Sequence, residues 1–261
     1  MDEKDQKYTE TFTRGPRLAL GVQGGSPKPK PVSPPTDPLP DIQLCLADEA
    51  TFWPWRRWPE FANWPDKERT VVVLPIAGFA DYGLGAGLDA EEAVLMSVLR
   101  EASLRRSPDL AMLVIPPVRF ALGPKPYCAF PIDPDAACEL LEEVLGWVDA
   151  AGFSKVLLLN ASPWNEEVTK AVGRDVRIAR GLQMYCIQLS SLGLDFDPVR
   201  GGDRAKLKAL LAALLGGDPA LAGTGANVLA EVSSHLVSLL SEIRNHPPLA
   251  ADGVLTTKTW P

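Results

Sequence analysis

Carboxylates are the side chains that could do chemistry together in this chain, because they follow several segments with strand character. The carboxylates near the expected strand ends are Asp81, Asp89, Glu91, Asp133, Glu166 and Asp203. A site built from carboxylates alone could bind Mg²⁺ or Ca²⁺, since both ions prefer oxygen ligands. However, Asp89, Asp133 and Asp203 stand where helix N-caps are expected, and capping explains them without a function. We favour the capping interpretation.

Other reactive groups are scarce at these strand ends. The two histidines, His235 and His246, fall in or after the last expected helix. This excludes a His-dependent triad or a His-bearing zinc site unless the C-terminus reaches over. The chain has no P-loop motif, and the glycines of GFADYGLGAG lack GxGxxG spacing. Cys128 has no visible base to activate it, so we interpret it as a buried thiol and Ser162 as a helix cap.

The segments that must position these residues alternate between strand and helix. Apolar, β-branched runs predict strands at 71–77, 109–117, 155–162 and 181–192. Capping and periodicity predict helices at 89–105, 134–151, 163–180, 203–216 and 225–244, the last capped by Thr224. This alternation predicts an α/β fold, a three-layer sandwich with a mainly parallel, doubly wound sheet. Ligands bind at the carboxyl edge of such a sheet, so the expected rim comprises the loops 78–89, 118–133, 160–165 and 192–203.

Composition predicts one sizeable globular domain. The chain has 261 residues, of which 46% are hydrophobic, and we place the domain at 42–246. Residues 1–41 are polar and rich in Pro and Gly, which predicts a disordered arm, and 247–261 form a C-terminal tail. A net charge of −7 disfavours nucleic acid as a partner. Without a long apolar run or a signal-like N-terminus, we expect a cytoplasmic protein with no membrane partner.

A tryptophan-rich segment precedes the first expected strand and carries the candidates for a protein interface. These candidates are Trp53, Trp55, Arg56, Arg57, Trp58 and Trp64. Tryptophan and arginine are enriched at interface hot spots and form cation–π stacks. Packing of the segment on the domain's own flank is an equally open alternative. Base stacking is disfavoured by the acidic overall charge.

Four loops, taken in chain order, resemble the motifs of the creatininase (creatinine amidohydrolase) family. The family's LPxGSxEQHGPHLPLGTD corresponds to LPIAGFADYGLGAGLDAEEA, its FPGT to AFPID, its NGHGGN to LLLNASPWNEE and its HAGExETS to VRGGDRAKL. The resemblance covers about residues 45–245, and the order and spacing of all four loops agree. It implies a creatininase-like fold and assembly into a homo-oligomer.

The same resemblance shows changes where the family has its metal ligands. The ligand positions fall here on Ala80, Tyr82, Gly85, Glu91 or Asp89, Ser162, Arg200, Asp203 and Ala205, whereas the flanking Asn160 and Asn165 are kept. In the family these groups hold two divalent metals that activate water for cyclic-amide hydrolysis. Alanine, tyrosine and serine are not equivalent ligands. The resemblance therefore implies a pseudoenzyme whose metal site is lost and which carries no cofactor.

Three functions remain open for such a creatininase-like protein. The first is a non-catalytic companion or structural subunit, in a homo-oligomer or in a hetero-oligomer with a creatininase-like relative. The second is a divergent hydrolase of amide C–N bonds that uses the same pocket without metals, with a carboxylate as acid or base. The third is a module that binds a small polar ligand. The pocket candidates are Asp81, Tyr82, Asp89, Glu91, Asn160, Ser162, Trp164, Asn165, Arg200 and Asp203.

Overall fold

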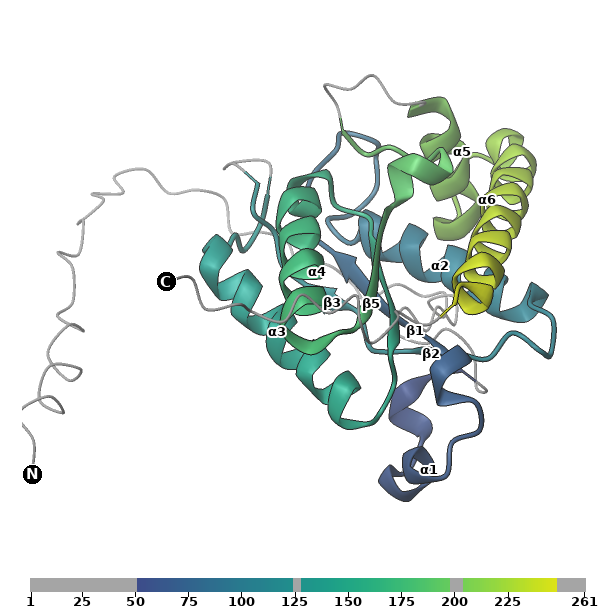
Figure 1. Cartoon of the computed structure of the whole chain (residues 1–261). Coiled ribbons are helices and arrows are strands. Elements are labelled where there is room, and N and C mark those ends of the chain that lie inside the picture. The colour runs from purple at the N-terminus through teal and green to yellow at the C-terminus, as the bar shows by residue number, and fades with distance from the viewer. Residues whose placement is uncertain (1–50, 124–127, 198–203, 248–261) are drawn as a thin grey trace, which may run out of the picture. The chain divides into compact units, whose positions relative to one another are not determined.

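The computed structural model describes residues 51–123, 128–197 and 204–247, and its centre is a parallel sheet (Figure 1). β1 (Val71–Ala77) pairs with β4 (Lys155–Asn160), and β4 pairs with β5 (Gln183–Gln188). On its other side, β1 pairs first with β2 (Met112–Val114) and then with β3 (Val118–Arg119). The strand order is therefore β2-β1-β4-β5, with β3 beside the end of β1.

Burial on both faces explains why β1 lies at the centre of the sheet. All residues of β1 are buried, and so are all residues of β4. Successive side chains in a strand point to opposite faces. Val71 and Val73 accordingly join the hydrophobic cluster on one face, whereas Val72 and Leu74 join the cluster on the other. A parallel sheet that is covered on both faces requires such continuous apolar strands.

Helices cover both faces of the sheet. α2 (Ala90–Arg105), α5 (Arg204–Leu215) and α6 (Pro219–Asn245) supply the hydrophobic cluster on one face. α3 (Pro134–Ala150) and α4 (Glu166–Arg180) supply the cluster on the other face, and Figure 1 shows the two helix layers on either side of the strands. The predicted three-layer α/β fold with a mainly parallel sheet is therefore confirmed.

Short elements join these layers and shorten some predicted strands. They are the helix α1 (Trp58–Ala62) and the 3₁₀ turns Trp53–Trp55, Lys67–Arg69, Pro163–Asn165 and Leu189–Leu192. The strand predicted at 109–117 is split into β2 and β3, because Pro116 and Pro117 lie between them and cannot donate to the ladder. The strands predicted at 155–162 and 181–192 end at 160 and 188, just before the last two of these turns.

The start of the last helix was predicted too late in the chain. α6 begins at Pro219 and not near residue 225. Asp218 is its N-cap, because the Asp218 side chain accepts a hydrogen bond from the Ala220 N–H at 2.9 Å. Thr224 lies inside the helix and is not a cap. An aspartate followed by proline is the stronger start signal, since proline fits the first helical position.

The capping interpretation holds for one of the aspartates and fails for another. Asp133 accepts a hydrogen bond from the Asp135 N–H at 2.9 Å and so caps α3. Asp89 stands at the N-cap position of α2, but its side chain makes no capping hydrogen bond, and Glu92, three residues later, forms no capping box with it. The Glu92 carboxyl instead pairs with the Arg119 guanidinium of β3 through contacts of 2.5 and 2.7 Å.

Two predicted segments, at the two ends of the chain, lie mostly outside the described residues. The predicted arm at 1–41 and most of the predicted tail at 247–261 lie outside them, so the domain boundaries stay predictions.

Among the described residues, no single helix has the length and apolar character to span a membrane. α5 and α6 meet that criterion only together, as a pair bent by 103°.

Candidate functional site

The candidate site lies at the carboxyl edge of the sheet, where β1 and β4 end. Gly78 follows β1 directly, Ser162 follows β4 by two residues, and Glu91 is the second residue of α2. Glu91 is completely buried, although glutamate is rarely buried in this way unless it is paired. The fold therefore places a carboxyl group of α2 against the ends of two central strands.

Both carboxyl oxygens of Glu91 accept hydrogen bonds. The Gly78 N–H donates to Oε2 at 2.5 Å, and the Tyr82 hydroxyl donates to Oε1. A Cβ on Gly78 would lie 3.1 Å from Ser162 Oγ and 3.2 Å from Glu91 Oε2, so the close approach of these groups favours glycine. Gly78, Tyr82, Glu91 and Ser162 form one buried polar group, here called the Glu91 cluster.

Burial determines the protonation of the Glu91 cluster. Loss of solvation raises the pKa of Glu91, and the hydrogen bonds from Tyr82 and Gly78 oppose this effect only in part. Burial also raises the pKa of Tyr82, and the neighbouring Glu91 charge raises it further. The Tyr82 hydroxyl is consequently a neutral hydrogen-bond donor near pH 7, and Glu91 holds its proton more tightly than an exposed glutamate does.

Asn160 and Asn165 tie together the loops around the Glu91 cluster. The Asn160 amide donates to the Ser162 carbonyl at 2.6 Å and to Gln188 Oε1 at 2.5 Å, and the Ser162 N–H donates back to Asn160 Oδ1 at 3.2 Å. The Asn165 amide donates to the Phe120 carbonyl at 2.7 Å. These two asparagines therefore fix the turn after β4 against β5 and against the loop after β3.

Trp164 and Asn165 also carry buried polar atoms without partners. In the part of the chain that the structure describes, Trp164 Nε1 and Asn165 Oδ1 are buried and make no hydrogen bond. Because nearly all buried polar atoms in folded proteins are paired, an unpaired donor and an unpaired acceptor in adjacent residues need an explanation. A bound ligand or an ordered water is the usual one.

Cys128 packs next to Trp164 at the edge of this site. A Cβ on Gly123 would clash with the Cys128 sulfur and would lie 2.7 Å from the Trp164 ring, so both side chains lie against that glycine. Burial raises the pKa of the Cys128 thiol, and the Glu91 charge raises it further. A protonated thiol is a poor nucleophile, which agrees with the interpretation of Cys128 as a buried thiol.

Not all predicted pocket residues meet at this site. The structure brings Tyr82, Glu91 and Ser162 together and places Asn160, Trp164 and Asn165 around them. Asp81 is exposed and accepts a hydrogen bond from the Gly83 N–H at 2.8 Å, which makes it a turn residue. Asp89 is partly exposed at the start of α2. Arg200 and Asp203 lie outside the described residues.

Sequence reasoning missed Gly78 and Gln188 as members of this region. Gly78 supplies a backbone donor to Glu91, and Gln188 joins Asn160 to Thr169 through a bond of 3.3 Å to Thr169 Oγ1. A glycine directly after a buried strand was a usable signal for close backbone approach. Gln188 carried a weaker signal, as a polar residue at the end of a strand.

Part of the tryptophan-rich segment packs on the domain itself, and part of it is exposed. Trp53 stacks on the buried Phe61 at 4.3 Å, and Trp64 lies 6.2 Å from Phe153, so both pack on the domain itself. Arg56 lies over the Trp64 ring at 5.6 Å. Trp55 and Trp58, in contrast, are more than half exposed. Arg57 is exposed as well and pairs with Glu60 at 3.0 Å.

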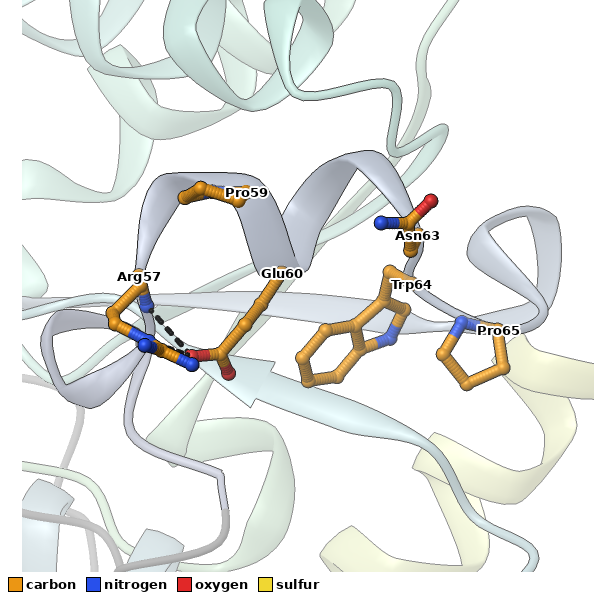
Figure 2. Close-up of a pocket in the computed structure, with 6 residues that line it drawn as sticks. All are labelled: Arg57, Pro59, Glu60, Asn63, Trp64 and Pro65. Atoms are coloured by element: carbon orange, nitrogen blue, oxygen red, sulfur yellow. Dashed lines mark hydrogen bonds and ion pairs between the residues drawn. The ribbon is translucent and has the colours of Figure 1, made fainter.

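A shallow pocket opens on this segment, away from the Glu91 cluster. It has a volume of about 450 Å³, and its lining residues are Arg57, Pro59, Glu60, Asn63, Trp64 and Pro65. Figure 2 shows the bond between Arg57 and Glu60 at one side of the pocket and the Trp64 ring beside it. The pocket contains one carboxylate and no potential nucleophile, so it lacks the paired groups that acid–base or nucleophilic catalysis needs.

The fold and the site define a three-layer α/β protein with a buried polar cluster at the carboxyl edge of a parallel sheet. A model of the creatinine amidohydrolase family matches residues 56–214, and the chain therefore belongs to the creatininase family. A search of curated proteins gives no match.

Solved structures agree with this family on the fold. A creatinine amidohydrolase (creatininase) is 13% identical, with a TM-score of 0.59, and the match covers 77% of this chain and 100% of that one. A candidate creatinine amidohydrolase from Bacteroides fragilis NCTC 9343 is 12% identical, with a TM-score of 0.58, over 77% and 98% of the two chains. A creatininase described with Mn is 14% identical, with a TM-score of 0.57, over 75% and 99%.

Two solved creatininases are described with metals: one with Mn, and a mutant one as the Zn-Zn type. The described residues of this chain do not fit such metals. Across 51–123, 128–197 and 204–247, no group of three or more His, Cys, Asp or Glu side chains could hold a metal ion. Glu91 is the one carboxylate of the Glu91 cluster, and its side-chain neighbours there, Tyr82 and Ser162, are not equivalent to the family's ligands.

Proposed function

We propose that this protein is a non-catalytic subunit with the creatininase fold, which acts through assembly and not through metal chemistry. The observation that carries the proposal is the Glu91 cluster. Glu91 is the one carboxylate there, and no group of three or more His, Cys, Asp or Glu side chains among the described residues could hold a metal ion with it. The raised pKa of Glu91 also favours the protonated carboxyl, whereas metal ligands must be deprotonated.

The groups around Glu91 support the same proposal. Tyr82 and Ser162 stand where the family resemblance expects histidine ligands; the Tyr82 hydroxyl now donates to Glu91, and the Ser162 hydroxyl packs against Gly78. The pKa of Tyr82 and the pKa of Cys128 are both raised by burial, so neither provides an anionic ligand near pH 7. In this proposal, the residues that replace the family's metal ligands serve to hold the loops of the fold together.

Elemental analysis of the purified full-length chain, combined with native mass measurement, tests this proposal. We expect zinc and manganese well below one ion per chain, together with the mass of an assembly of more than one chain. A metal-bearing creatininase purified by the same protocol is the positive control. Stoichiometric zinc or manganese would overturn the loss of the metal site, and a monomer at every accessible concentration would overturn the assembly role.

Binding of a small polar ligand is a second candidate function, favoured by Trp164 Nε1 and Asn165 Oδ1. An unpaired indole donor and an unpaired amide acceptor in adjacent residues suit a ligand that presents both an acceptor and a donor, as an amide group does. Thermal-shift measurements with a panel of small amides test this, since a ligand raises the unfolding midpoint by mass action. The shift should disappear in Trp164→Phe and persist in Trp53→Phe. Hydrolysis of the bound amide would extend this candidate to a divergent amide hydrolase.

A further inference from the structure

Two tryptophans form an exposed aromatic pair on the surface of the domain. Trp58 of α1 and Trp147 of α3 are 57% and 64% exposed, and their rings meet edge to face at 6.3 Å. Their exposure contrasts with that of Phe61, which also contacts Trp58 but is buried. Large aromatic side chains that remain this exposed are typical of interface hot spots.

The apolar surface continues from this pair along α3. Leu140 is 41% exposed, and Val144, one turn further along the helix, is partly buried. Residues three, four and seven positions apart share one side of a helix. Leu140, Val144 and Trp147 therefore form one stripe. This stripe and Trp58 are here called the Trp147 face.

Opposite charges stand at the two ends of the Trp147 face. Arg57 precedes Trp58, and its side chain is 87% exposed although it pairs with Glu60. Glu143 is exposed on α3, one turn before Trp147. α1 lies beside the C-terminal end of α3 (Figure 1), and Glu143 precedes Trp147 by one turn in the direction of the other end of that helix. A surface that is basic at one end, apolar in the middle and acidic at the other end is complementary to itself after a half-turn.

We infer that the Trp147 face is a two-fold interface between two copies of this chain. The Trp58–Trp147 pairs of both copies meet at the axis, and Arg57 of one copy faces Glu143 of the other. The indoles supply the buried centre, and the surrounding surface of α1 and α3 supplies the remainder of the roughly 800 Å² that each partner buries in a stable dimer. The inference rests on the proposed function, because it names the partner for the assembly role.

Charge reversal in the full-length chain tests the pairing. Arg57→Glu and Glu143→Arg each place like charges across the axis, so each homodimer should weaken about tenfold in sedimentation equilibrium. Mixing the two variants should restore the wild-type affinity, because both pairs across the axis are then opposite in sign. A mixture that stays as weak as its components overturns the two-fold pairing. Glu60→Gln is the control for the lost Arg57–Glu60 bond and should leave the dimer unchanged.

Truncation of the central indole tests the apolar part of the interface. Trp147→Ala should weaken the dimer by about 30-fold, the effect of a hot-spot residue. Leu104→Ala on α2 is the matched control, because Leu104 is also 64% exposed, and it should have no effect. Thermal unfolding midpoints check that each variant is folded.

The outcomes of this experiment separate the inference from the proposed function. An assembly whose mass is unaffected by Trp147→Ala overturns the inference and leaves the assembly role intact. A dimer that depends on Trp147 but contains stoichiometric metal overturns the proposed loss of the metal site and leaves the inference intact.

Discussion

Two buried ionisable side chains stand at opposite edges of the same sheet and are used in different ways. Lys155 begins β4 and is 1% exposed, and its ammonium group donates to the carbonyls of Ile243, Arg244 and His246 at 3.0, 2.7 and 2.5 Å. Glu91 lies at the carboxyl edge and accepts from Gly78 and Tyr82. Each side chain is buried with its polar partners.

The surroundings of these two residues differ. The last carbonyls of a helix have no partners within the helix, and a cation is favoured there, so the end of α6 fully explains a buried lysine. In the same region as Glu91, Trp164 Nε1 and Asn165 Oδ1 are buried and have no hydrogen-bond partner among the described residues. Stability alone therefore explains the edge of the sheet at Lys155, whereas the edge at Glu91 retains features of a binding site.

Removal of Lys155 should have the largest effect on stability. Lys155→Met leaves the end carbonyls of α6 without a donor, and we expect a loss of about 3 kcal/mol in the free energy of unfolding, since each orphaned buried group costs about 1–3 kcal/mol. Denaturant unfolding measures this loss. Lys170→Met is the control, because Lys170 is 50% exposed and its ion pairs should contribute at most about 1 kcal/mol. Equal effects of both substitutions would contradict the comparison.

Gly78→Ala should have the second largest effect on stability. Gly223→Ala is the matched substitution and should change stability in the opposite direction. Gly78→Ala crowds three atoms within 3.1–3.2 Å and should cost about 2 kcal/mol, as overpacking of a core does. Gly223→Ala in α6 meets nothing within 4 Å and should gain about 0.5–1 kcal/mol, because alanine favours the helix. Both changes can be measured by denaturant unfolding. A neutral Gly78→Ala would show that the Glu91 cluster is loosely packed.

Glu91→Gln should change stability by an amount that depends on pH. Burial raises the pKa of Glu91 in the fold above its unfolded value, so its stabilising contribution is complete below the unfolded pKa and is lost as pH rises through the folded pKa. The glutamine variant does not titrate. Relative to the wild type, its stability should therefore increase with pH, by at most about 1.4 kcal/mol per pH unit. The free energy of unfolding of both proteins is measured from pH 4 to pH 8. A difference between them that stays constant over this range would contradict the raised pKa.

The framework of the fold could be predicted from the sequence, because its signals are local. The buried run at 71–77 and the Asp133–Pro134 start of α3 appear where they were expected. The Asp218–Pro219 start of α6 was overlooked, although its signal is of the same kind.

The interior of the site could be predicted only in part. Tyr82 and Ser162 were expected in the pocket, but the complete burial of Glu91 was not, since acidic residues in a first helical turn are usually solvated. The burial of Glu91 and Glu92 depends on partners from other segments of the chain. Glu91 needs the N–H of Gly78, and Glu92 needs Arg119 from β3. Such partners become visible only when the strands are placed side by side.

Calorimetric titration of Zn²⁺ into the wild-type chain and into Glu91→Gln tests the central claim most directly. The hydrogen-bonded Glu91 cluster predicts no saturable, stoichiometric binding in the wild type, and the same weak background in the variant. Saturable binding of Zn²⁺ by the wild type that is lost in Glu91→Gln would show that this edge of the sheet still holds a metal, and would contradict the account.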